Sequence, residues 1–293
     1  MAVRKRKVST FDIIIVLFMI FMIFITLYPM YYVVISSISD LKALTRHVGF
    51  LWKPLEPLNL TAYKALLSSR EVLLGFKNTC IQLGLGLVVN MVMTTLGAYF
   101  LSLKTPMLKL PVNFMIIFTM YFSGGMVPSY LNMRDLGLLN SVWSLVLPGA
   151  IGTANLIMLR TAFNSIPDSL TESAKLDGAS DLTILTRVLI PLSKATLAVL
   201  VLYYGVGHWN SWFNASIYLR DRDLYPLQLV ARNILILGND GEFMGEVGML
   251  EESEYSEVIK NTMVVISTVP ILALYPFLQK YFVKGVMVGA LKG

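Results

Sequence analysis

Charged residues are scarce in this sequence of 293 residues. Only 14% of the residues are Asp, Glu, Lys or Arg, whereas 56% are hydrophobic. Soluble domains carry about 25% charged residues on average, so the composition excludes a soluble globular protein and indicates an all-α, polytopic membrane protein. The net charge of +6 does not indicate a nucleic-acid partner, because the basic residues are scattered among loops, where they usually set membrane topology.

Cysteine and histidine are equally rare. Cys80 is the single cysteine, which excludes an internal disulfide and a cysteine-based metal cluster. The two histidines, His47 and His208, lack the spacing of a metal site, so no metal is expected. The apolar segments contain almost no ionisable residue besides His208, which argues against a membrane-embedded enzyme. The phosphate-binding pattern G-x-x-x-x-G-K-[ST] is also missing, so the chain is not expected to bind ATP by that route.

The N-terminal region lacks the marks of a cleavable signal peptide. Residues 4–7 are basic, and the apolar run that follows is too long for a signal peptide and contains no small-x-small cleavage site. We interpret this region as a signal anchor that keeps residues 1–10 in the cytoplasm.

Six segments are long and apolar enough to cross a bilayer, for which a helix needs about 20 residues. They cover about residues 11–37, 78–102, 111–131, 141–162, 191–219 and 261–283. The first is expected to kink or end near Pro29. We interpret residues 11–293 as one transmembrane domain with both termini on the same side. The distribution of Lys and Arg favours the cytoplasm for that side, although the predicted outer loop 38–77 is also basic.

The most informative stretch, residues 163–192, separates the fourth and fifth predicted spans. Its pattern predicts two amphipathic half-helices around Gly178, which would supply the left-handed conformation that ends the first half-helix. Asp168 or Ser169 is expected to cap the first half-helix, and Ser180 the second. The residues expected to form the apolar face and the end of the second half-helix are Leu182, Leu185, Leu189 and Pro191. The product is a cytoplasmic helix pair, either a docking surface for a soluble partner or merely a capped loop.

The residues of this stretch resemble the EAA loop of ABC-importer permeases. The family pattern is Glu-Ala-Ala, three residues, Gly, nine residues, Ile, any residue and Leu-Pro. The corresponding positions here are Glu172, Ser173, Ala174, Gly178, Val188, Ile190 and Pro191. Three of them, Ser173, Val188 and Ile190, depart from the pattern, each conservatively in size.

Two further features resemble the carbohydrate branch of this family. Asp177-Gly178-Ala179 is the sequence typical of that branch at this turn. Residues 279–293 resemble the C-terminal tail of the six-span sugar permeases of the maltose-importer type. The N-terminal region and Trp209–Asn214 resemble a subgroup that handles complex oligosaccharides, including alginate. The EAA loop alone would also allow an ABC importer for a non-sugar solute such as a peptide or a polyamine.

The resemblance implies the type I ABC-importer permease fold, with six transmembrane helices and the cytoplasmic coupling pair 163–190. It implies four kinds of partner: a second and usually different permease, two ATPase subunits that bind ATP and Mg²⁺, an extracytoplasmic solute-binding protein, and the oligosaccharide. This chain would hold no cofactor and would lie in the bacterial cytoplasmic (inner) membrane. The residues implied in coupling to the ATPase are Glu172, Ser173, Ala174, Asp177, Gly178, Ala179 and Pro191.

Polar and aromatic side chains inside the apolar spans are candidates for the substrate path, because such residues must face the helix bundle or a cavity. Aromatic faces stack on the C–H surfaces of sugars, and amides bond to hydroxyl groups. The candidates are Asn90, Asn155, Tyr204, His208, Trp209, Asn210, Trp212 and Asn214. The alternative is that these residues hold helices together or form an interfacial aromatic belt.

An acidic oligosaccharide would favour basic residues along the path. The candidates Arg160, Arg220, Arg222 and Arg232 fall at the edges of the predicted spans or outside them. They would either attract the substrate or set the topology. The acidic segment 240–257 is either a contact for the binding protein or a solvated loop.

Overall fold

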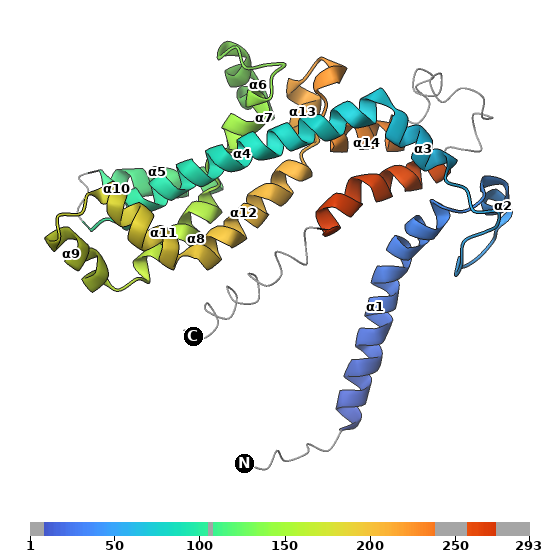
Figure 1. The fold of residues 1–293 in the computed structure, drawn as a ribbon, viewed down its shortest axis with the longest axis horizontal. Helices are drawn as coiled ribbons and strands as arrows, with labels where there is room; N and C mark the ends of the chain where they lie inside the picture. Colours follow the sequence, from blue (N-terminus) through green and yellow to red (C-terminus); the bar gives the residue numbers. More distant parts are fainter. Residues whose placement is uncertain (1–8, 105–107, 238–256, 274–293) are drawn as a thin grey trace. The chain divides into compact units, whose positions relative to one another are not determined.

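The computed structural model describes residues 9–104, 108–237 and 257–273, and every regular element within these ranges is helical. Figure 1 shows these elements along the chain. The chain divides into two compact units, Met1–Ser69 with Ile234–Thr268, and Arg70–Asn233 with Val269–Gly293.

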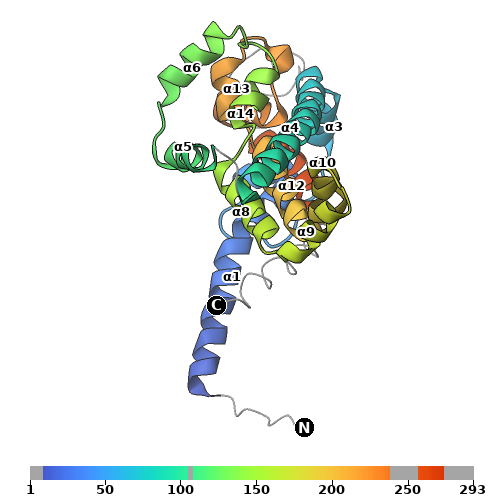
Figure 2. The ribbon, with the colours of Figure 1, turned by 90° about the vertical axis from the view of Figure 1, so that its left-hand side faces the viewer.

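The first unit is built around the apolar helix α1 (Thr10–Ser36), the long blue helix in Figures 1 and 2. A capping box starts it, because Ser9 accepts from the helix backbone while Asp12 accepts from the Ser9 amide. The helix continues through Pro29 to Ser36, so it does not end near Pro29. The unit also contains α2 (Leu41–Arg46), α3 (Thr61–Ser68) and residues 257–268 of a helix that runs over 257–273.

Two hydrogen bonds tie the helix over 257–273 to α1. Tyr32 Oη donates to Glu257 Oε1 over 3.0 Å, and Thr262 Oγ1 donates to the Ser37 carbonyl over 3.4 Å. Thr262 is fully buried. The last predicted span, 261–283, therefore begins earlier, at 257, and its part beyond 273 lies outside the described residues.

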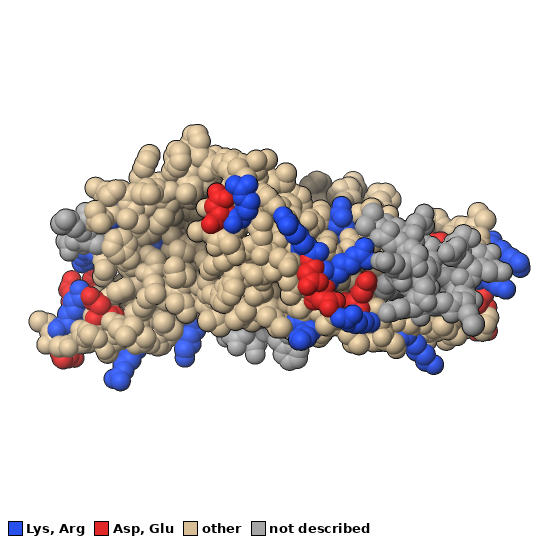
Figure 3. All heavy atoms as spheres, turned by 90° about the horizontal axis from the view of Figure 1, so that it is seen from above, with Lys and Arg blue, Asp and Glu red and all other residues tan. Residues whose placement is uncertain are grey.

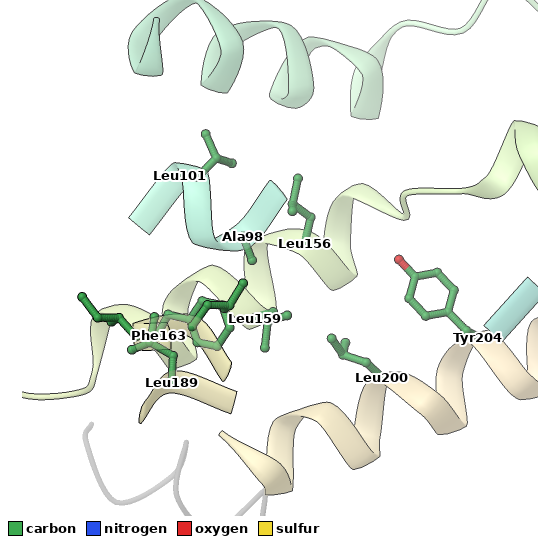
Figure 4. Close-up of a cluster of buried hydrophobic side chains, with 10 residues drawn as sticks. Ala98, Leu101, Leu156, Leu159, Phe163, Leu189, Leu200 and Tyr204 are labelled. Atoms are coloured by element: carbon green, nitrogen blue, oxygen red, sulfur yellow. The ribbon is translucent and has the colours of Figure 1, made fainter. Parts of the chain in front are cut away.

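The second unit is organised around the 33-residue helix α4 (Arg70–Ser102). Helices α8 (Thr153–Asn164) and α12 (Lys194–Trp209) pack along it. Their buried side chains converge in the cluster of Figure 4, and the labelled members are Ala98, Leu101, Leu156, Leu159, Phe163, Leu189, Leu200 and Tyr204. Because lipid is as apolar as leucine, close packing rather than exclusion of water stabilises such contacts between membrane helices.

A second cluster lies at the other end of α4. It joins α6 (Met126–Asp135), α7 (Trp143–Val146), α13 (Phe213–Tyr218) and α14 (Leu227–Leu237). Its buried members are Met133, Leu145, Ala215, Tyr218, Leu219 and Leu229. In Figure 1, α9 (Asp168–Leu176) lies beyond one end of α4, and α13 lies well away from it, farther along α4.

The predicted spans of this unit differ from the helices in their bounds and continuity. Helix α4 begins at Arg70 rather than near 78, and its first turn carries Glu71, a charge that a helix N-terminus favours. Segment 111–131 is divided into α5 (Lys109–Tyr121) and α6 around residues 122–125, where Gly125 has φ of 86°. Segment 141–162 is divided into α7, the 3₁₀ turn η1 (Leu147–Gly149) and α8. Segment 191–219 is divided into α12 and α13.

Within the described residues, two helices are long and apolar enough to cross a membrane, namely α1 and α4. Two bent pairs of helices would bring the number to four if each pair forms one span: Trp143–Gly149 with Thr153–Asn164, bent by 49°, and Asp181–Leu192 with Lys194–Trp209, bent by 85°. Uncharged side chains cover most of the described surface in Figure 3, as expected for a protein surrounded by lipid.

Candidate functional site

The first candidate site is the hairpin over 163–192. Helix α9 ends in a Schellman motif, in which the Ala179 amide donates to the Ala174 carbonyl over 2.9 Å and the Gly178 amide donates to Lys175 over 3.0 Å. Gly178 has φ of 77°, the left-handed conformation that the sequence predicted for it. Ala174 and Ala179 pack on the cluster of Figure 4. The turn is therefore fixed by backbone hydrogen bonds and by packing.

The second half of the hairpin begins at the predicted cap. Ser180 Oγ accepts from the Thr183 amide, and α10 (Asp181–Ile184) follows. The chain continues as the π-helical turn η2 (Leu185–Leu189) and α11 (Ile190–Leu192). Pro191 has no amide to donate to the Arg187 carbonyl, and a wider turn before a proline is one way in which a helix accommodates that loss. The helix thus ends one residue after Pro191.

The cap predicted for the first half-helix is wrong. Pro167 occupies the position before α9, and no side chain caps the helix there. Asp168 lies inside the first turn, where with Glu172 it binds Lys104, which follows α4: Lys104 Nζ is 2.9 Å from Asp168 and 3.4 Å from Glu172. The hydrogen bond that Lys104 donates to Asp168, and to a lesser extent the one it donates to Glu172, raises the pKa of Lys104 above its ordinary value.

A second link joins the hairpin to α4. Tyr99 Oη donates to Asp181 Oδ1 over 2.8 Å, so both half-helices are held at the end of α4. Below this link, Ile184, Leu185 and Leu189 are buried in the same cluster as Phe163. The hairpin is consequently continuous with the core of the second unit.

The exposed side of the hairpin is partly apolar. Leu182 was predicted on the buried face, but 66% of its surface is exposed, because the π turn and α11 carry Leu185 and Leu189 inward instead. Leu176, at the end of α9, is 89% exposed. Of the residues that resemble the EAA loop, Glu172, Ser173, Asp177, Gly178 and Pro191 are exposed, and Ala174 and Ala179 are half-buried. The arrangement presents polar and apolar side chains on a rigid support.

The second candidate site contains three of the predicted path residues. Asn90 is fully buried on α4, and its Nδ2 donates to the carbonyls of Gly149 and Ala150 over 2.6 and 3.1 Å. These bonds orient the amide, so that Asn90 Oδ1 accepts from Nε2 of His208 over 2.6 Å. The His208 ring lies against Gly86, where an added Cβ would be 2.3 Å from Nε2.

Tyr204 makes a similar arrangement one turn away. Its Oη accepts from the Gly152 amide over 2.8 Å and bonds to Thr94 Oγ1 over 2.7 Å. Asn90 and Tyr204 thus bind backbone groups at 149–152, the break that separates the α7–η1 segment from α8. Backbone groups freed by a break inside a membrane need such partners.

The other predicted path residues lie elsewhere. Trp209 is buried against Phe76 of α4, with ring centroids 6.1 Å apart. Asn155 is half-buried, and three predicted residues are exposed at and after the end of α12: Asn210, Trp212 and Asn214. The structure therefore separates a buried polar group on α4 and α12 from an exposed group at 210–214.

The basic candidates have different partners. Arg160 donates to Asn113 Oδ1 over 2.6 Å, and Arg220 donates to Tyr130 Oη over 3.4 Å. Arg232 of α14 lies over the ring of Trp212, with Cζ 4.6 Å from the ring centroid. Residues 240–256 of the acidic segment lie outside the described residues, and only its last residue, Glu257, is described. The C-terminal stretch 279–293 also lies outside them.

Comparison with known proteins decides the family. No family model matches the chain. The polygalacturonan/rhamnogalacturonan transport system permease protein YtcP of Bacillus subtilis is 39% identical over 237 residues, which are 80% of this chain and 82% of that protein. Protein LplC of the same organism is 36% identical, with 97% of this chain and 95% of that protein covered.

This chain belongs to the carbohydrate ABC transporter permeases. A crystal structure of a bacterial ABC transporter involved in the import of the acidic polysaccharide alginate contains a chain that is 34% identical to this permease. The two superpose with a TM-score of 0.88, over 96% of this chain and 100% of that one. A chain from a bacterial alginate ABC transporter in complex with an alginate pentasaccharide-bound periplasmic protein has the same fold, with a TM-score of 0.60 and 16% identity. The permease is a membrane transport protein rather than an enzyme.

Sequence reasoning missed two polar residues of the buried group in the permease, Thr94 and Gln82. Thr94 is fully buried and bonds to Tyr204. Gln82 on α4 is 1% exposed, and neither its amide nitrogen Nε2 nor its amide oxygen Oε1 has a hydrogen-bond partner among the described residues. A signal for it exists in the sequence, because polar or small residues recur every four positions along α4: Asn78, Gln82, Gly86, Asn90 and Thr94. Four-residue spacing places them on one face of the helix.

The described part of the permease contains no group of three or more His, Cys, Asp or Glu residues that could hold a metal ion. The expectation that this chain carries no metal or cofactor of its own stays a prediction.

Proposed function

We propose that this permease forms half of the translocation pathway of a binding-protein-dependent ABC importer for oligosaccharides, including acidic ones. The observation that carries the proposal is the 34% identity and TM-score of 0.88 over the whole of a chain from an alginate importer. In this proposal the permease has six transmembrane helices of the type I fold, with both termini in the cytoplasm of a bacterial cell. Its partners are a second, different permease, two ATPases and an extracytoplasmic binding protein.

The relatives support an acidic substrate. One of them, YtcP, is a polygalacturonan/rhamnogalacturonan transport permease, and another belongs to an importer of the acidic polysaccharide alginate. Both polygalacturonan and alginate are polymers of sugars that carry a carboxylate. An importer of their fragments must therefore accept negative charge as well as hydroxyl groups.

The hairpin supports a role in coupling. ATP and Mg²⁺ are bound by the partner ATPases in this proposal, because the sequence has no phosphate-binding loop. Movement must then reach the permease through a contact in the cytoplasm. The Schellman turn, the Ser180 cap and the contacts with Lys104 and Tyr99 support the transmission of such movement to α4, since a loose loop would absorb it.

The path residues would then have two different roles. Asn90, Tyr204 and His208 hold the interrupted helix at 149–152, so in this proposal they shape the path rather than line it. Asn210, Trp212 and Asn214 offer exposed amides and an aromatic face, which suit sugar hydroxyls and C–H surfaces.

Uptake by cells tests the proposal. A strain that lacks this chain should fail to accumulate radiolabelled oligogalacturonate or alginate trisaccharide, and the plasmid-borne chain should restore accumulation. Retained uptake of every oligosaccharide, together with loss of peptide or polyamine uptake, would contradict the sugar assignment.

A further inference from the structure

We propose that Arg232 and Trp212 form a subsite for the carboxylated sugar ring of an acidic oligosaccharide. The inference rests on the proposed function, because it names the ligand group that an importer of acidic sugars must recognise. Arg232 lies on α14, and Trp212 lies in the break between α12 and α13. The guanidinium carbon is 4.6 Å from the centre of the indole ring, and Trp212 is 38% exposed.

Among the described residues, the guanidinium of Arg232 has a ring contact but no oxygen partner. Three basic residues of the second unit are half-buried within its described part: Lys109, Arg160 and Arg232. Lys109 donates to the Leu103 carbonyl and Arg160 to Asn113, whereas no described residue accepts a hydrogen bond from Arg232. Partial burial removes water from a charged group, and the loss is normally offset by hydrogen bonds. The ring of Trp212 offsets part of it through the cation–π contact, which leaves N–H donors of the guanidinium for a ligand.

The chemistry of the pair fits a carboxylated pyranose. A guanidinium matches the two oxygens of a carboxylate, and each N–H···O bond is strengthened by charge. An indole ring beside it provides a flat apolar surface for the C–H face of the sugar. Gln228, four residues before Arg232, lies on the same face of α14 and is half-buried, so its amide is placed to bind a neighbouring hydroxyl. A neutral sugar could use the indole and the amide but would leave the guanidinium unpaired.

Binding of two matched probes tests the subsite. The probes are trigalacturonate and its methyl ester, which differ in charge but have the same ring and hydroxyl groups. Equilibrium binding to the assembled importer is measured in detergent without the binding protein. Any difference in affinity between the acid and the ester then comes from the membrane subunits. We expect the wild-type importer to bind the acid at least about tenfold more tightly than the ester, as the loss of a charge-assisted pair implies.

Variants then assign the preference to this pair. Arg232→Gln should remove the preference by weakening binding of the acid while changing binding of the ester by less than about twofold. Arg134→Gln is the matched control, because Arg134 already has a carboxylate partner, Asp135, at 2.9 Å. That variant should keep the wild-type preference. If Arg232→Gln does not assemble, Arg232→Lys is used, which keeps the charge but loses the planar fork and should retain only part of the preference.

Three results separate the proposals. Equal binding of acid and ester by the wild-type importer, or an unchanged preference in the Arg232 variants, would overturn the subsite. Uptake of oligosaccharides with the binding protein present, alongside such a result, would leave the proposed function standing. Absence of all oligosaccharide uptake by the wild-type importer would instead refute the proposed function, and the subsite with it.

Discussion

At the scale of single residues, a glycine decides how closely α4 and α12 approach. The ring of His208 occupies the space where Gly86 has no side chain, and the bond from Nε2 to Asn90 holds the ring there. Asn90 in turn binds the carbonyls of Gly149 and Ala150. These five positions thus form one connected group that joins α4 and α12 to the helix break at 149–152.

Replacement of Gly86 by alanine should disturb this group. The new Cβ would lie 2.3 Å from His208 Nε2, so the ring must move and the bond to Asn90 must lengthen or break. Overpacking of this kind typically costs about 1–3 kcal/mol. We expect the Gly86→Ala variant of the importer to unfold in detergent at a lower temperature than the wild type.

Gly84→Ala provides the matched control, since it lies on the same helix and its Cβ would meet no atom within 4 Å. Its melting temperature should equal or slightly exceed that of the wild type, because alanine favours a helix by about 1 kcal/mol over glycine. Equal melting of both variants and the wild type would show that the ring of His208 is not held as described.

The sequence predicted the residues of this group better than their connections. The buried polar residues Asn90, Tyr204 and His208 are conspicuous inside apolar runs. Asn90 and His208 are 118 positions apart, and no local pattern indicates that they meet. The four-residue repeat along α4 does indicate a shared face, but a repeat cannot reveal that this face binds the backbone of a broken helix.

At the scale of elements, the hairpin shows which local signals suffice. The glycine turn and the Ser180 cap follow from single residues and their immediate neighbours, and both predictions are confirmed. The cap before α9 and the position of Leu182 were predicted wrongly. The contact of Asp168 with Lys104 and the π turn before Pro191 decide these features, and both depend on how the hairpin meets α4 and α12.

The two faces of the hairpin should respond differently to truncation. Leu185 is 3% exposed and belongs to the cluster of Figure 4, so Leu185→Ala should destabilise the importer by about 2–5 kcal/mol. Leu182 is 66% exposed, and Leu182→Ala should change stability by less than about 0.5 kcal/mol. Thermal unfolding of the two variants in detergent checks both values, and equal destabilisation would contradict the described burial.

At the scale of the whole molecule, the proposed importer draws its energy from partner ATPases, because this sequence has no phosphate-binding loop. One end of α4 holds the hairpin, and the residues proposed to meet the sugar lie on α13, α14 and the break before them. Helix α4, with α8 and α12 packed along it, connects these two ends within the second unit. A change in the hairpin should therefore affect transport without touching the residues proposed to bind the substrate.

The most direct test of this claim is to measure ATP hydrolysis and oligosaccharide uptake together in proteoliposomes that contain the importer and its binding protein. Gly178 has φ of 77°, and an added Cβ would meet no atom within 4 Å, so a substitution there acts through the backbone alone. Gly178→Val places a β-branched residue in a conformation that costs about 1–2 kcal/mol, whereas asparagine tolerates it. We predict that Gly178→Val hydrolyses ATP but accumulates little sugar, while Gly178→Asn keeps both activities. Uptake by Gly178→Val at the wild-type ratio of sugar to ATP would contradict the coupling role of the hairpin.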